Sequence, residues 1–251
     1  MPRYFLEVAY KGTNYSGFQI QDNARSVQAE VEKALATLFR KQLNLTGSSR
    51  TDTGVHALQN YFHFDFERVI DPKMIYNINA LLPRDIVLKN IWPVRDEAHC
   101  RFDALGREYR YYIYHRKDPF IDDRAYFFPY KLDIASMQAA AGIVSRHSDF
   151  TSFSKRSTQV KTFICTIGES RWFYDEEGVL AYQVAANRFL RGMVRGLVGT
   201  MLQVGRGKLS LEEFEQVLIR RDNGHADFSV PGHGLFLLRV SFPDSILQTS
   251  E

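Results

Sequence analysis

Apolar and polar residues alternate in several short segments of this chain, and a period of two is typical of β-strands. The clearest example, near the N-terminus, places four residues on one face: Tyr4, Leu6, Val8 and Tyr10. Residues 61–66 put three phenylalanines on one face in the same way, which predicts a half-buried strand. Two glycines interrupt the alternation between residues 11 and 19, so this segment is predicted to be a loop.

Between these strands the apolar spacing changes to that of a helix. Val27, Val31 and Leu35 recur near the helical period, and Ser26 is placed to cap the helix. Its polar side is expected to face water through Glu30, Glu32, Lys33 and Arg40. A second helix is predicted from Asp71-Pro72 to Leu82, before Pro83, and a strand follows at residues 86–88.

The second half of the chain repeats this alternation of strands and helices. A strand over residues 107–114 places Tyr109, Tyr111 and Ile113 on one face. Helices are predicted from Asp133, from Phe189 to Val204, and from a capping box at Ser210. Two strands joined by a hairpin turn and one closing strand are also predicted, at residues 162–174, 179–186 and 235–242.

These elements predict an α+β fold made of two similar halves, with mixed, largely antiparallel sheets and helices on the outer face. The halves are expected at residues 1–105 and 106–245, and residues 246–251 form a frayed tail. A polar stretch at 150–161, which carries Lys155, Arg156 and Lys161, is predicted to be a mobile flap.

Composition narrows the class of protein. The chain has 251 residues, of which 45% are hydrophobic, enough for a large core. No apolar run is long enough to cross a bilayer, and the N-terminus leads directly into a strand, so a cytoplasmic protein is expected. Cys100 and Cys165 are isolated and are expected to be buried thiols. The seven histidines show no tight ligand spacing, so no metal is expected.

The net charge of +3 permits a polyanionic partner but does not require one. The position of the basic residues must therefore decide whether the chain has such a partner. Arg188, Arg191 and Arg195 are spaced by three and four residues and would line one stripe of the predicted helix. Such a stripe is either a solvated basic face or a binding site for phosphates. Together with Lys11, Arg50 and the interleaved aromatics, it suits a nucleic acid whose bases are splayed out and stacked.

The loop at residues 48–57 contains a single acid, Asp52, flanked by Arg50 and Gly54. A carboxylate held by a cation and approached closely at a glycine can serve in catalysis, whereas an aspartate in such a loop also commonly forms an Asx-turn or caps a helix. Asp52-Thr53-Gly54 is also the tripeptide of aspartic proteases, which need two such carboxylates. The chain has no second copy of the tripeptide, and Arg50 would keep the carboxylate ionised.

Residues 49–57, Ser-Arg-Thr-Asp-Thr-Gly-Val-His-Ala, resemble the Gly-Arg-Thr-Asp-Ala-Gly-Val-His-Ala signature of the TruA family of tRNA pseudouridine synthases. Three further motifs of that family occur in the same order, at residues 10–19, 107–111 and 187–199. The departures are Ser49 for Gly, Thr53 for Ala, Lys11 for Asp, Phe18 for Trp, and Val230-Pro231-Gly232 for Ala-Pro-Ala.

The resemblance implies the pseudouridine synthase fold, no cofactor, a homodimer, and isomerisation of uridine to pseudouridine at positions 38 to 40 in the tRNA anticodon arm. It assigns Asp52 as the nucleophile, Arg195 as its charge partner and Tyr109 as the base-stacking residue that removes the C5 proton. The alternative for Tyr109 is a core strand aromatic, a place that is expected for Tyr111 instead. It implies tRNA contacts by Arg50, Thr51, Gly54, His56, Lys11, Gln19, Asn187, Arg188, Phe189 and Arg191. A non-catalytic RNA-binding protein with the same fold is the alternative.

Overall fold

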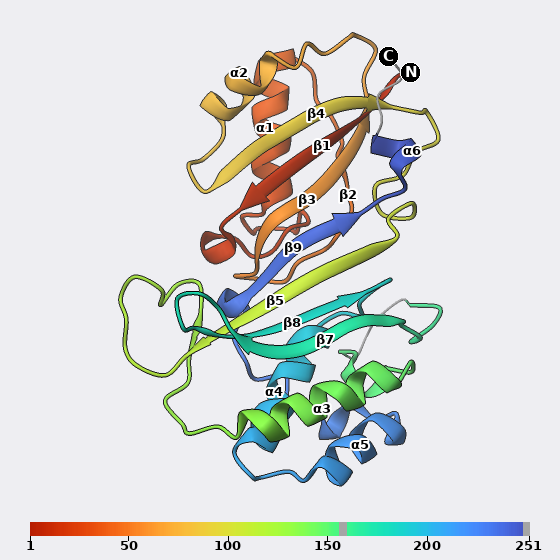
Figure 1. Ribbon diagram of the computed structural model, residues 1–251. Helices are drawn as coiled ribbons and strands as arrows, with labels where there is room; N and C mark the ends of the chain where they lie inside the picture. Colours follow the sequence, from red (N-terminus) through yellow and green to blue (C-terminus); the bar gives the residue numbers. More distant parts are fainter. Residues whose placement is uncertain (156–159, 248–251) are drawn as a thin grey trace. The chain divides into compact units, whose positions relative to one another are not determined.

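The structure is a computed structural model that describes residues 1–155 and 160–247, and Figure 1 labels most of its helices and strands. The chain divides into two units, one of Met1–Leu105 with Phe236–Glu251 and the other of Gly106–Leu235. Residues 236–245, which the sequence pattern assigns to the second half, therefore belong to the first unit. The reason is that β9 (Leu235–Ser241) pairs in parallel with β3 (His56–Asp65), a long-range contact that periodicity does not reveal.

The first unit is built on a mixed sheet with the strand order β4-β1-β3-β9. β1 (Arg3–Tyr10) is antiparallel to both β3 and β4 (Ile86–Val94), and the short β2 (Thr46–Gly47) adds to β3. Helices α1 (Val27–Phe39) and α2 (Met74–Leu81) accompany the sheet (Figure 1). A 3-10 turn, η1 (Gly12–Asn14), follows β1, so residues 11–19 form the predicted loop.

Helix α1 begins as predicted, because the Ser26 hydroxyl accepts a hydrogen bond from Ala29 N. The prediction that Glu32 faces water is wrong, since its side chain is 7% exposed. Glu32 Oε1 accepts hydrogen bonds from Leu45 N and from Gln28 Nε2, both at 2.9 Å. The carboxylate thus replaces water for a buried backbone amide of the segment that returns along the helix.

Strand β3 is buried on both faces, not on one as predicted. Phe62 and Phe64 lie on one face, while Tyr61 and His63 are also buried on the other. Phe242, which follows β9, covers this second face and meets the Tyr61 ring edge-on at a centroid distance of 5.0 Å. Many antiparallel strands leave one face in water, so the cover that Phe242 provides on the second face could not be predicted from the alternation of residues 61–66.

Helix α2 starts two residues later than Asp71-Pro72 predicts. Asp71 Oδ1 accepts from Lys73 N at 2.8 Å, which forms a turn ahead of the helix. At the other end of the chain, Asp244–Leu247 forms the short helix α6 and Ile246 is buried, so the predicted fraying does not begin at residue 246. Residues 248–251 of the predicted tail lie outside the described residues.

The second unit contains an antiparallel sheet in the order β5-β8-β7. Its strands are β5 (Gly106–Tyr114), β7 (Ile167–Tyr174) and β8 (Leu180–Ala186), with β6 (Tyr126–Phe127) parallel to β5. Helices α3 (Ile134–Arg146), α4 (Met193–Gly205) and α5 (Leu211–Arg220) gather on one side of this sheet (Figure 1). The described residues of this unit also form the 3-10 turns η2 (Thr151–Phe153), η3 (Asn223–His225) and η4 (Gly232–Gly234).

The predicted caps of this unit are confirmed. Asp133 accepts from Ser136 N at the start of α3, and Ser210 and Glu213 form both arms of a capping box at α5. The α+β class is confirmed as well, because each unit combines a sheet with helices. Cys100 and Cys165 are buried thiols, as expected, and burial raises the pKa of the Cys165 thiol to about 11. Among the described residues, no helix is long and apolar enough to span a bilayer.

A buried histidine gives the first unit a specific pH dependence. His63 is 6% exposed, and its Nδ1 lies 3.2 Å from Cys100 Sγ. Burial, assisted by His99 and Arg3, lowers the pKa of His63 from 6.5 to about 4. Between these values the unfolded chain binds a proton that the folded unit does not. Stability from this group is therefore complete above about pH 6.5 and is lost as the pH falls toward 4.

We expect His63→Gln to remove about 2 to 3 kcal/mol of the difference in free energy of unfolding between about pH 7 and pH 4.5. The variant side chain does not titrate, so the proton uptake that disfavours the folded state disappears. Urea unfolding of wild type and variant at both pH values measures the change. An unchanged pH dependence would show that His63 is protonated in the folded unit.

Candidate active site

The polar loop that contains Asp52 connects β2 with β3 in the first unit. Two backbone hydrogen bonds flank Asp52 and join the loop to residues 11–19: Phe18 N to Thr51 O at 3.1 Å, and Gly54 N to Tyr15 O at 3.3 Å. The carbonyl of Asp52 accepts from Val55 N at 3.2 Å, which closes a turn. Gly54 has φ +76, a conformation that favours glycine. Asp52 is half-buried, and Arg50 beside it is exposed.

A buried polar network fixes the residues just before Asp52. The Thr51 hydroxyl shares a hydrogen bond of 2.8 Å with the Tyr10 hydroxyl. Asn60, which is fully buried on β3, donates to Tyr10 Oη at 3.2 Å and to Ser49 O at 2.8 Å, and accepts from Ser49 N at 3.2 Å. Thr51 therefore points into the unit and away from solvent, where it orients the loop.

His56 is also buried, with 1% exposure. Its Nδ1 accepts a hydrogen bond from Gly12 N at 3.1 Å, and its ring stacks on Phe236 at a centroid distance of 4.5 Å. Gly12 must be glycine, because a Cβ there would lie 2.0 Å from Val55 O. The neighbouring predicted contacts Lys11 and Gln19 are exposed at the two ends of the 11–19 loop. The structure thus brings together all seven predicted site residues of the first unit.

Two buried hydroxyls of this loop have no hydrogen-bond partner among the described residues, Ser48 Oγ and Ser49 Oγ. A buried unsatisfied hydroxyl costs about 1 to 3 kcal/mol. We expect Ser48→Ala to raise the free energy of unfolding by about 1 kcal/mol, measured by urea denaturation. The control is Ser152→Ala, whose buried hydroxyl donates to Val217 O at 2.5 Å and whose loss should destabilise. A comparable decrease in the free energy of unfolding in both variants would contradict the expectation.

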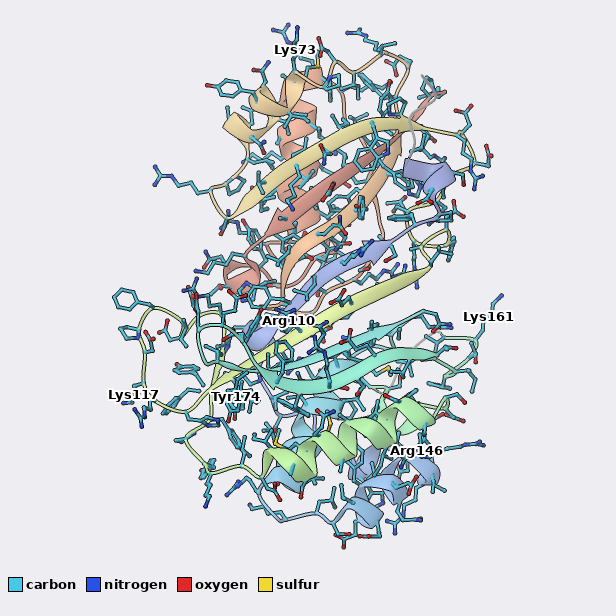
Figure 2. All side chains as sticks on the ribbon, viewed as in Figure 1. Lys73, Arg110, Lys117, Arg146, Lys161 and Tyr174 are labelled. Carbon is cyan, nitrogen blue, oxygen red and sulfur yellow. The ribbon has the colours of Figure 1, made fainter. Side chains whose placement is uncertain are left out.

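The second unit carries the other predicted site residues. Tyr109 lies on β5 opposite Val184 of β8, is half-buried, and meets the Phe189 ring edge-on at a centroid distance of 5.0 Å. Tyr111, two residues along, is fully buried and donates to Pro231 O at 2.8 Å. Burial raises the pKa of Tyr111, so this hydroxyl remains a donor. Arg110, labelled in Figure 2, belongs to the alternate face of β5 and donates to Gln183.

The predicted stripe of three arginines on one helix is wrong. Helix α4 begins at Met193, after Gly192, which has φ +77. Arg188, Phe189 and Arg191 therefore lie in an irregular segment ahead of the helix. Lys155 covers this segment: its N–H donates to Arg191 O at 3.0 Å, and a Cβ on Gly192 would lie 2.9 Å from Lys155 Cγ. Arg188 and Phe189 are half-buried, while Arg191 is exposed.

Arg195 lies in the first turn of α4 and is held by backbone carbonyls. Its Nε donates to Val230 O at 2.8 Å and its Nη2 to Phe228 O at 3.5 Å. The segment that presents these carbonyls is fixed by Asp227, which accepts from Gln203 Nε2 and from Ser229 N, both at 2.8 Å. Burial opposes ionisation of Asp227, but these hydrogen bonds outweigh it and lower the pKa of its carboxyl.

Asn187 connects the ends of two strands. Its Oδ1 accepts from Thr166 N at 2.8 Å, and its carbonyl accepts from Arg107 Nη1 at 3.3 Å. The predicted flap at 150–161 begins as packed structure, because Phe150, Ser152 and Phe153 are buried around η2. Its central part, residues 156–159, lies outside the described residues, and Lys161 is exposed (Figure 2).

A family model described as tRNA pseudouridine synthase matches this chain over residues 7–103 and 147–243, which includes segments of both units. The chain belongs to the tRNA pseudouridine synthase family. Members of this family are isomerases, and the two matched segments agree with the repeated α+β halves of its fold.

Individual members of the tRNA pseudouridine synthase family match over the full length. The chain is 43% identical to tRNA pseudouridine synthase A of Parabacteroides distasonis, with 100% of each chain covered. It is 44% identical to the protein of that name from Bacteroides fragilis, with 98% of each covered. It is 38% identical to that of Staphylococcus saprophyticus, with 98% of this chain and 93% of the relative covered.

Sequence reasoning missed Asn60, which holds the Asp52 loop, and Asp85, which holds the 11–19 loop beside it. Asn60 is a polar residue inside an apolar strand, and that exception was the available signal. Asp85 stands directly before a strand, where its side-chain oxygens accept from Asn14 and Tyr15. Among the described residues, no group of three or more His, Cys, Asp or Glu side chains is arranged to hold a metal ion.

Proposed function

We propose that this protein isomerises uridine to pseudouridine at positions 38 to 40 of the tRNA anticodon arm, with Asp52 as the nucleophile. Its membership of the tRNA pseudouridine synthase family supports the reaction class. The observation that carries the assignment of Asp52 is its loop, where the backbone is fixed on both sides of one half-buried carboxylate. Rigid positioning of a single reactive group is what covalent or acid-base catalysis requires.

The reaction rearranges bonds without gain or loss of atoms. The N1–C1′ bond of uridine breaks, the uracil turns, and a C5–C1′ bond forms; C5 loses its proton and N1 gains one. Asp52 starts cleavage either by attack on C1′ or by removal of a C2′ proton, and both routes need an ionised carboxylate. Because the overall change is redox-neutral and forms no high-energy bond, the chemistry requires no redox cofactor or nucleotide.

We propose that Tyr109 and Arg195 act on the same nucleotide as Asp52. Tyr109 carries a half-buried ring already in contact with Phe189, suited to stacking on a base and to taking the C5 proton. The guanidinium of Arg195 is oriented by two carbonyls, which suits a fixed counter-ion for a carboxylate. Since the target base must leave its stack, some binding energy has to offset flipping, which costs a few kcal/mol.

The ten residues for which the resemblance implies tRNA contacts fall into three groups. Lys11, Gln19, Arg50, Asn187 and Arg191 are exposed and are proposed to contact RNA directly. Arg188 and Phe189 are half-buried, the Phe189 ring contacts that of Tyr109, and both residues are proposed to contact the flipped nucleotide. Thr51, Gly54 and His56 shape the loop. The resemblance also supports a cytoplasmic homodimer in which one tRNA touches both subunits.

Release of tritium from tRNA that contains 5-tritiated uridine tests the proposal, because the C5 hydrogen is lost only when the new bond forms. We expect release from unmodified tRNA with uridine at positions 38 to 40. The matched control is the same tRNA with cytidine at these three positions, from which no release is expected. Binding of tRNA without any release would overturn the catalytic proposal and favour the RNA-binding alternative. Equal release from both tRNAs would overturn the assignment of positions 38 to 40 as the modified uridines.

A further inference from the structure

The loop of residues 11–19 determines where Asp52 stands in the first unit. Three hydrogen bonds join its backbone to the Asp52 loop. Phe18 N donates to Thr51 O, Tyr15 O accepts from Gly54 N, and Gly12 N donates to His56 Nδ1. These contacts lie on both sides of Asp52. A shift of residues 11–19 would therefore carry the carboxylate with it.

The two loops also touch too closely for independent movement. A Cβ at Gly12 would lie 2.0 Å from Val55 O, and one at Gly17 would lie 3.0 Å from Thr51 O. Gly17 has φ +113, so its backbone takes a conformation that side chains disfavour. Both glycines allow backbone to pack directly on backbone, next to residues that flank Asp52.

Asp85 anchors the 11–19 loop to the sheet. Lys11 N donates to Asp85 O at 2.9 Å, Asn14 Nδ2 to Oδ2 at 3.1 Å, and the Tyr15 hydroxyl to Oδ1 at 2.5 Å. Asp85 directly precedes β4, whose first residue Ile86 pairs with Tyr10 of β1. The acceptor is thus fixed by the strands, and three groups of one loop converge on it.

The Asp85–Tyr15 hydrogen bond is strong because one partner is charged. Partial burial opposes ionisation of Asp85, yet the hydrogen bonds from Tyr15 and Asn14 hold the pKa of its carboxyl below the ordinary value. Burial and Asp85 raise the pKa of Tyr15, so the phenol stays protonated as the donor. Arg25 lies 4.9 Å from the Tyr15 ring centroid and adds a cation to the cluster.

We propose that Asp85 and Tyr15 are positioning residues for the reaction: their hydrogen bond holds the 11–19 loop, which in turn holds Asp52 in its reactive place. The inference rests on the proposed role of Asp52. Neither residue touches the reacting atoms in this role. Replacing either residue should therefore lower turnover and leave tRNA binding intact. A displacement of the reactive group by about 1 Å can lower the rate by a factor of about 100.

Kinetics of Tyr15→Phe, Asp85→Ala and the double variant test the proposal, with Asp85→Asn as the conservative replacement. We expect kcat to fall about 10- to 100-fold in Tyr15→Phe and Asp85→Ala, with KM for tRNA within about threefold of wild type. The double variant should lose little more than Asp85→Ala, because Asp85→Ala already removes the hydrogen bond that Tyr15→Phe removes. Asp85→Asn keeps an acceptor and should recover part of kcat. The control Asp71→Ala removes another turn-forming carboxylate of the same unit and should leave kcat unchanged.

A second measurement keeps this inference separate from the proposed function. Amide hydrogen exchange at Phe18 and Gly54 reports the two bonds that flank Asp52, and it requires no activity. We expect Tyr15→Phe to speed exchange at both amides and Asp71→Ala at neither. If the wild-type protein releases no tritium but Tyr15→Phe still speeds exchange at both amides, the proposed function is wrong. The role of Tyr15 in holding the 11–19 loop is then still supported. Unchanged exchange, or higher KM at unchanged kcat, would overturn the positioning role.

Discussion

Asp52→Asn is expected to lower the rate of tritium release by at least about 10⁴-fold while tRNA affinity stays within about threefold of wild type. The amide has nearly the shape of the carboxylate but neither its charge nor its nucleophilicity. Both proposed routes, attack on C1′ and removal of the C2′ proton, need that charge. Single-turnover tritium release and filter binding of the same tRNA measure the two quantities.

The fold gives reason to expect that this variant remains intact. The hydrogen bonds that fix the loop use backbone atoms at Thr51 and Gly54, and the carbonyl of Asp52 accepts from Val55 N. None of these depends on the carboxylate. The buried network beneath the loop is formed by Thr51, Tyr10 and Asn60, which the substitution leaves in place. Loss of activity would therefore report chemistry and not unfolding.

Thr53→Ala provides the matched control in the same loop. Thr53 is exposed and adjacent to Asp52, so this variant should keep activity within about threefold. The introduced asparagine of Asp52→Asn can deamidate and regenerate a trace of carboxylate. Asp52→Ala cannot, and it should be as inactive as Asp52→Asn. Turnover in Asp52→Ala close to that of wild type would rule out Asp52 as the nucleophile, whatever the binding data show.

Local interactions explain what could be predicted from the sequence. Ser26, Asp133 and the Ser210–Glu213 pair cap helices through bonds that span three residues, so composition at these points was enough. The strand of Tyr109 and the hairpin between β7 and β8 follow from alternation and turn residues. The motif around Asp52 stood out because one acid lies among serines, threonines and glycine.

Tertiary contacts explain what could not be predicted. The start of α4 was misplaced because apolar spacing does not show that Gly192 adopts a positive φ or that Lys155 packs against it. Glu32 was placed in water because its partner, the amide of Leu45, lies thirteen residues away. The anchoring role of Asp85 has the same cause, since Tyr15 is seventy residues distant. The sequence shows an aspartate or glutamate in the same way whether its carboxylate binds water or a buried donor, so it cannot distinguish the two cases.

Arg195→Met is expected to lower kcat about 100-fold with only a small change in tRNA affinity. Methionine is a good helix former of similar length, so the first turn of α4 should persist. The lost guanidinium is held by Val230 O and Phe228 O and is proposed to stabilise the ionised form of Asp52. Arg195→Lys keeps a charge without the planar fork and should recover part of the rate. Single-turnover tritium release and equilibrium binding of tRNA measure both effects.

The division between turnover and affinity identifies what Arg195 does. A counter-ion for the reacting carboxylate acts on the charge that changes along the reaction, so its loss appears in kcat. A phosphate contact acts equally before and during reaction, so its loss appears in the binding constant. Arg191→Met is the matched control: its side chain is exposed four residues earlier, and its loss should weaken tRNA binding and leave turnover of bound tRNA unchanged. Equal losses of turnover and affinity in Arg195→Met would make Arg195 a phosphate contact like Arg191 and would remove it from the chemistry.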